Sequence, residues 1–224
     1  AIHPELDASM IYSKNKVAIK DINEKGFGFF VSHSKEGIVR GTGLLVSANG
    51  DNLSNDILSP QIAAYYSLNK GNSKQSYPSS QMGSIALLRQ SLYDFQYYTK
   101  SDLNFTDLSM EAWKSQMDLP KFFQTADKFE ILRANKIADE FNSNFIYLGS
   151  GNEYEAVDPL KKINPKIVVP INFPEAYDVS DPYISRLIPL SKLKHWELAP
   201  FNFKILKENN IEVAISSSGI KSTD

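Results

Sequence analysis

The three histidines are the only imidazole groups of this chain, and imidazole is the side chain best suited to proton transfer near neutral pH. His33 ends an apolar segment and is flanked by serines. Its position predicts either a group facing the mouth of a barrel or an ordinary loop histidine. His195 would act as a general base only if Glu197 oriented it, but close neighbours on one helix do not face each other. We therefore expect His195 to be a structural histidine in a helix bend.

Anion binding and acid chemistry have other candidates. Lys70 lies in a polar loop, and Ser80 is placed to cap the helix that follows; free N–H groups at a helix start attract anions, although a loop lysine is commonly just solvated. Arg40 precedes a glycine-rich strand segment and is a third candidate binding residue. Glu153 is a candidate catalytic acid at a strand end, or a first-turn helix acid stabilised by the dipole. The sequence contains no Gly-x-Ser-x-Gly motif, so nothing supports a serine hydrolase.

The amino-acid composition limits the classes of partner that the chain is expected to bind. The chain has 224 residues, 42% hydrophobic content and a formal net charge of −2, so no electrostatic bias toward nucleic acid exists. No apolar run reaches the length of about 20 residues that a membrane-spanning helix needs. The absence of cysteine excludes disulfides and thiolate sites but not any compartment. An exported or periplasmic location, as part of a longer protein, remains an open alternative.

Hydrophobic periodicity predicts the elements of the first half. An amphipathic helix is expected over residues 14–25, ended by Gly26, and two neighbouring strands over 27–31 and 37–46. A polar stretch at 69–76 predicts a loop, and a long helix capped by Ser79 or Ser80 is expected to run to about Tyr98. Residues 50–120 are thus expected to hold an inserted polar loop and long helices.

The second half alternates strands and helices more regularly. The strands are expected at residues 121–126, 144–149, 166–171 and 212–216, and the helices at 129–141, 154–163 and about 191–209. Nearly continuous apolar strands separated by helices are typical of a parallel sheet covered on both faces. A doubly wound sheet would satisfy the same alternation, but no Gly-x-Gly-x-x-Gly follows a strand. We predict an α/β chain that forms one domain over residues 1–224.

Four stretches resemble the amidohydrolase superfamily, in particular its imidazolonepropionase-like branch. They are RGTG at 40–43, YPSSQMGSIALLRQ at 77–90, GSGNEY at 149–154 and HWELAP at 195–200. The resemblance implies an incomplete TIM-like (β/α)8 barrel of parallel strands that lacks at least the first strand and the closing helix. It also implies that the chain is an internal fragment of a larger protein, a hydrolase relative acting on carbon–nitrogen bonds other than peptide bonds.

The resemblance further implies where metal ligands belong. The family carries a histidine pair after its first strand, which would precede Ala1, and histidines after its fifth and sixth strands. By strand matching these last two fall on Thr125 or Ala126 and on Gly149 or Ser150, and the aspartate after the eighth strand falls on Ser218. Neutral hydroxyls are poor zinc ligands. We therefore expect no metal and no cofactor in this segment, with Thr125, Ser150 and Ser218 as binding residues and zinc as the family alternative.

Two hypotheses of different class remain. In the first, the chain is a barrel that has lost its metal site and binds a small molecule, peptide or carbohydrate. In the second, it is an active metal-dependent amidohydrolase completed by ligands outside the segment. Its expected partner is the remainder of the parent polypeptide, and open sheet edges predict self-association. Bound zinc in the full-length protein would favour the enzyme.

Overall fold

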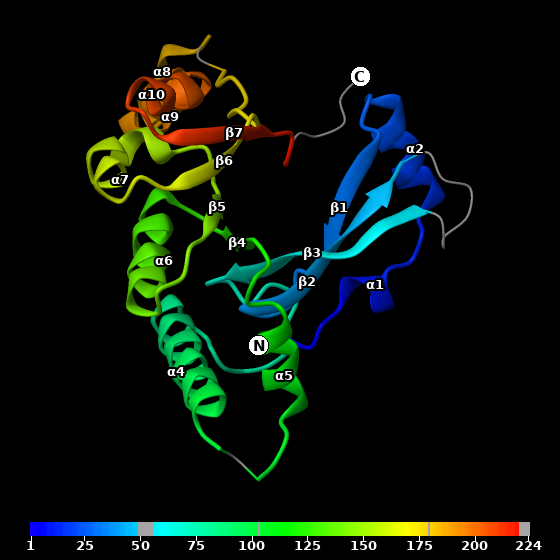
Figure 1. Cartoon of the computed structure of the whole chain (residues 1–224). Helices are drawn as coiled ribbons and strands as arrows, with labels where there is room; N and C mark the ends of the chain where they lie inside the picture. Colours follow the sequence, from blue (N-terminus) through cyan, green and yellow to red (C-terminus); the bar gives the residue numbers. More distant parts are fainter. Residues whose placement is uncertain (49–55, 103, 179, 220–224) are drawn as a thin grey trace. The chain divides into compact units, whose positions relative to one another are not determined.

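A computed structural model of the chain describes residues 1–48, 56–102, 104–178 and 180–219 (Figure 1). The chain divides into two compact units, Ala1–Phe122 and Phe123–Asp224. The sequence predicted a single domain over residues 1–224, and that assignment stays a prediction. Each unit has strands and helices of its own, so the fold class is mixed α/β.

The strands of the first unit are antiparallel. They are β1 (Phe29–His33), β2 (Val39–Ser47) and β3 (Ile57–Ser67). β1 pairs with β2 so that Phe29 lies opposite Ser47 and His33 opposite Gly43, and β2 pairs in turn with β3. The connection between β1 and β2 is too short for the crossover that parallel neighbours need. The expectation of parallel strands throughout is therefore wrong for this unit.

Side-chain caps determine where the helices of the first unit begin. The helices are α1 (Ala8–Ile11), α2 (Lys16–Glu24), α4 (Gln81–Lys100) and α5 (Leu108–Ser115). Asn15 accepts from the first N–H groups of α2, and Gly26 follows that helix with φ +87°. Ser80 caps α4 by accepting from Gly83 N at 3.1 Å. The predicted helices and the polar loop at 69–76 are confirmed.

The core of the first unit has one cluster beneath α1 and another beside α5. Leu44 and Val46 of β2 pack with Ala8, so α1 covers that face of the sheet. Buried Trp113 of α5 lies 5.2 Å from the ring of Phe95 and donates its indole N–H to Tyr66 Oη at 3.0 Å. β3 was not predicted, because residues 50–120 were expected to contain only a loop and helices.

The second unit holds parallel strands joined by helical crossovers. β4 (Lys121–Gln124) spans the division between the units, and it is followed by β5 (Ile146–Leu148), β6 (Lys166–Pro170) and β7 (Glu212–Ser216). β5, β6 and β7 are hydrogen-bonded in that order, with Ile146 opposite Lys166 and Lys166 opposite Glu212. Because parallel strands run the same way, their carboxyl ends share one edge.

The crossover elements of the second unit match the predicted alternation. They are α6 (Lys128–Glu140), the 3-10 turn η1 (Glu153–Ala156), α7 (Val157–Ile163), α8 (Pro182–Leu187), α9 (Leu190–Leu198), η2 (Ala199–Phe201) and α10 (Asn202–Glu208). Fully buried Ile131, Leu160, Ile167 and Leu206 form the core. The strand–helix alternation is compatible with an incomplete barrel. None of the helices that the described residues form combines the length and apolar character that crossing a bilayer requires.

Candidate functional site

Thr125 follows β4 and is buried. Its Oγ1 donates to the Leu148 carbonyl oxygen at 2.8 Å, and its backbone N–H donates to the same oxygen at 3.0 Å. One carbonyl at the end of β5 therefore receives both donors of this threonine. The hydroxyl therefore links the ends of β4 and β5 by a hydrogen bond.

Glu153 is the most buried acid at this edge, with an exposed fraction of 0%. Its carboxylate accepts from Ser150 N at 2.5 Å, from Gly151 N at 3.1 Å and from Asn202 Nδ2 at 2.7 Å. Ser150 Oγ lies 3.2 Å from the same carboxylate. A Cβ at Gly149 would lie 2.6 Å from Glu153 Oε1, so any other residue there would displace the Glu153 carboxylate. Through these hydrogen bonds the buried Glu153 side chain closes the β5–η1 turn.

His195 belongs to a second polar group of this unit. Tyr154 Oη lies 3.0 Å from His195 Nδ1 and 3.2 Å from Glu155 Oε1, while Lys128 Nζ donates to Glu155 Oε2. The Tyr154 and His195 rings are nearly parallel, with centroids 6.0 Å apart. Burial, with the charge of Glu155, raises the pKa of Tyr154 to about 12, so its hydroxyl remains protonated at neutral pH. Tyr154, rather than Glu197, holds His195.

The strand-end residues do not fit a divalent cation. Thr125 and Ser150 offer neutral hydroxyls already bonded within the unit, and Ser218 is exposed, its N–H donating to Ser216 Oγ at 3.1 Å. Ser150 is in contact with Glu153, whereas no hydrogen bond joins Ser218 to either within the described part of the chain. No group of three or more His, Asp or Glu side chains that could hold a metal occurs among the described residues.

The candidate binding residues of the first unit form hydrogen bonds with backbone groups of other residues in that unit. Buried Arg40 donates to the carbonyl oxygens of Gly37 and Asn69, each at 2.9 Å, and burial lowers its pKa to about 10. Lys70 Nζ donates to the Gln75 carbonyl oxygen at 2.6 Å. Ser80 is the cap of α4. These contacts hold the loop that precedes α4.

His33 lies at the end of β1 in a stack of rings. Its imidazole centroid is 3.8 Å from that of Tyr65 with 5° between the planes, and Tyr65 stacks in turn on Phe122 at 5.5 Å. A Cβ at Gly43 would lie 2.5 Å from Tyr65 Cε2, so Tyr65 occupies the space that a side chain on β2 would fill. His33 Nδ1 lies 2.7 Å from the Ser34 carbonyl oxygen. The ring is thus held in both plane and direction.

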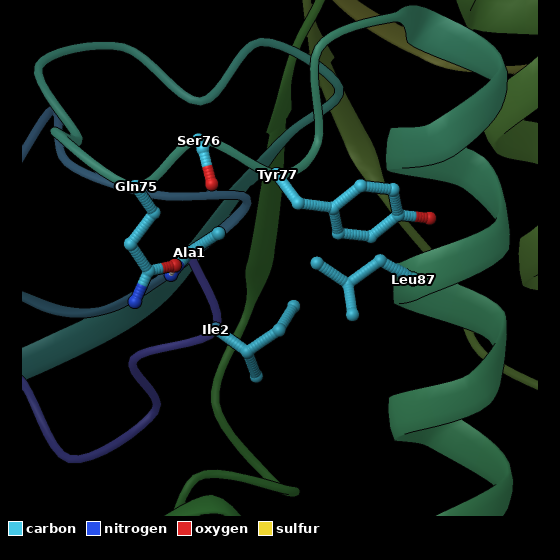
Figure 2. Close-up of a pocket in the computed structure, with 6 residues that line it drawn as sticks. All are labelled: Ala1, Ile2, Gln75, Ser76, Tyr77 and Leu87. Carbon is cyan, nitrogen blue, oxygen red and sulfur yellow. Dashed lines mark hydrogen bonds between the residues drawn. The ribbon is translucent and has the colours of Figure 1, made fainter.

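A pocket of about 560 Å³ lies between the loop that precedes α4 and α4 itself, lined by Ala1, Ile2, Gln75, Ser76, Tyr77 and Leu87. Figure 2 shows Tyr77, Leu87 and Ile2 on its apolar side and Gln75 and Ser76 on its polar side. The amino group of Ala1 donates to Gln75 Oε1. Among the described residues, the side chains that line this pocket are either apolar or polar without charge.

Several residues of these groups were missed from the sequence. Tyr65 was missed because β3 was not recognised, although the apolar run at 62–66 indicates a buried strand. Tyr154 is the first residue of a predicted helix, and its partner His195 is 41 residues away. Asn202 joins Glu153 across 49 residues. No local pattern indicates either of these long-range pairs.

The sequence matches no family model. It also matches no curated protein. Among solved structures it is similar to an amidohydrolase from Thermotoga maritima, with a TM-score of 0.75 and 17% sequence identity. The match covers 97% of this chain and 58% of that one, so the chain spans little more than half the length of its structural neighbour. Identity this low bears on architecture alone. The chain has an amidohydrolase-like fold.

Proposed function

We propose that this chain belongs to a protein of the imidazolonepropionase-like branch that has lost its metal site in this segment and binds a small molecule, peptide or carbohydrate. One observation carries the proposal. The hydroxyl of Thr125, at the expected position of a metal-binding histidine, donates to the Leu148 carbonyl oxygen. It is used to join two strand ends and is neither charged nor a nitrogen ligand.

The neighbouring strand end supports the same proposal. At Ser150 a histidine would be needed, but its hydroxyl is 2.8 Å from Asn152 Oδ1 and its N–H binds Glu153. Glu153 is the nearest carboxylate, and backbone N–H groups and the Asn202 amide already use it. Freeing Glu153 for a cation would leave those buried donors unpaired, which is costly.

A hydrolase completed from outside this segment is the second candidate. It is favoured by the amidohydrolase-like fold and by the 58% of the neighbour's length that the chain spans. In such a protein the chain would supply walls of the site, and the metal would be held by residues elsewhere in a longer polypeptide.

Metal analysis of the full-length protein separates these candidates. After dialysis against a chelator and then against zinc, the proposal expects no stoichiometric zinc and no zinc-dependent hydrolysis of amide or imide substrates. The matched variants are Thr125→Val, which removes only the hydroxyl, and Ser150→Ala. The proposal would be contradicted if the wild-type protein bound about one or two equivalents of zinc and either variant bound less, because those hydroxyls would then be ligands. Zinc retained in both would establish the second candidate.

A further inference from the structure

The geometry around His33 determines which nitrogen of its ring is basic. A carbonyl oxygen only accepts hydrogen bonds, so the contact of 2.7 Å between Nδ1 and the Ser34 oxygen requires the proton on Nδ1. In the neutral ring this leaves Nε2 with a lone pair. Burial, and the charges of Arg40 and Lys35, lower the pKa of His33, although the Ser34 carbonyl acts in the opposite direction. The ring is therefore neutral at neutral pH.

The first unit also prevents this ring from turning. β1 and β3 are each antiparallel to β2, so they run the same way, and Tyr65 of β3 stacks on His33 near their carboxyl ends. Gly43, opposite His33 on β2, leaves room for the Tyr65 ring. An imidazole with a determined tautomer and a restricted plane presents a fixed acceptor.

The groups near His33 indicate which kind of hydrogen-bond donor suits its Nε2. Within the described ranges, His33 has no hydrogen-bond partner at Nε2. Val31 and Phe29 lie on the same face of β1 as His33, because side chains alternate along a strand. Their exposed fractions are 41% for Val31 and 64% for Phe29. The positive charges of Arg40 and Lys35 disfavour a cationic donor.

We propose that Nε2 of His33 accepts a hydrogen bond from an uncharged N–H or O–H group of a small ligand whose apolar part lies against Val31. This inference goes beyond the proposed function, because His33 belongs to the first unit and the strand ends that support the proposed function belong to the second. The donor is either an amide N–H or a hydroxyl, because each can donate a hydrogen bond to the lone pair of Nε2. Tyr65 and Gly43 act as positioning residues.

The test uses full-length protein labelled with ¹⁵N-histidine. The ring nitrogens of His33, assigned with His33→Phe, should show the Nδ1–H tautomer at pH 7.5. N-acetylleucinamide presents amide N–H groups beside an isobutyl group, and isobutyl β-glucoside presents hydroxyls beside the same group. At least one probe should shift the Nε2 resonance saturably, and which probe does so identifies the source of the donor. Isopentylammonium, the matched cation, should bind more weakly.

Substitution tests whether the shift reports a hydrogen bond. His33→Phe keeps a ring for the Tyr65 stack but lacks the acceptor, so affinity for the active probe should fall about three- to tenfold. Gly43→Ala should weaken binding by displacing Tyr65, with the fold checked by circular dichroism. His3→Phe is the matched control and should leave affinity unchanged.

Three results would overturn the inference: an Nε2–H tautomer for His33, no His33 shift with either probe, or equal affinity in wild type and His33→Phe. None of these depends on zinc. A zinc result that contradicts the proposed function can therefore be told apart from a failure of this inference.

Discussion

The two units hold an imidazole in different ways. In the first, His33 is held by a backbone carbonyl and by a ring 3.8 Å away, so its nearest contacts cannot change charge near neutral pH. In the second, His195 is held by the hydroxyl of Tyr154, which also contacts Glu155, itself paired with Lys128. The first arrangement presents a neutral acceptor of constant character. The second connects a histidine, through one tyrosine hydroxyl, to the ion pair of Glu155 and Lys128.

The largest effect is expected from removing the carboxyl group of Glu153, the residue that precedes Tyr154 of the second arrangement. Glu153→Ala leaves the N–H groups of Ser150 and Gly151 and the amide of Asn202 without an acceptor in a buried site. We expect the free energy of unfolding in urea to fall by about 3 kcal/mol. Added formate should restore part of the loss, because its carboxylate suits the same donors.

Glu155→Gln is the control for this change. Glu155 is partly exposed and belongs to a surface ion pair, so its substitution should cost less than about 1 kcal/mol. Equal losses in the two variants, or no rescue by formate, would show that Glu153 does not anchor the turn.

Gly43→Ala breaks the first arrangement and should have the next largest effect. The added Cβ would lie 2.5 Å from Tyr65 Cε2, which forces the ring away from His33. Overpacking of this kind costs about 1–3 kcal/mol, measured by urea unfolding. Gly28→Ala is the matched control, because a Cβ there meets nothing within 4 Å. A Gly43→Ala protein as stable as wild type would mean that the stack does not need glycine on β2.

Tyr154→Phe should lower the stability less than the two changes above. It keeps the stacked ring but removes the hydroxyl between His195 and Glu155, which should cost about 1 kcal/mol. The ¹⁵N resonances of His195 should move, and those of His33 should stay where they are. Movement of both histidines would contradict the view that the two are held independently.

The smallest effect is a pH dependence contributed by His33. Burial, with Arg40 and Lys35 nearby, lowers its pKa below the ordinary value of 6.5, whereas the unfolded chain takes up the proton near 6.5. Between these two pKa values the unfolded state binds more protons, so the contribution of His33 to stability decreases as the pH falls below 6.5. Unfolding curves of wild type and His33→Phe between pH 5 and 8 should therefore differ in slope. Parallel slopes would contradict the lowered pKa.

Much of the fold could be predicted because its signals are local. The strands of the second unit and helix α6 lie close to their predicted ranges, since apolar runs and capping residues indicate them directly. β3 was missed because it follows residues read only as loop, and the antiparallel pairing of β1 and β2 was overlooked in favour of the barrel pattern. The candidate site was less predictable. His33, Glu153 and Ser150 were recognised as candidates, but their partners were not.

The sequence by itself determined the features that depend on neighbouring residues. Ser80 caps α4, and Asp127 caps α6 through N–H groups two and three residues away. Only the tertiary structure decided which distant groups meet: Asn202 with Glu153, His195 with Tyr154, and Trp113 with Tyr66. The physical reason is range. A cap closes within a single turn of chain, whereas these contacts form only when separate elements have packed and excluded water from between them.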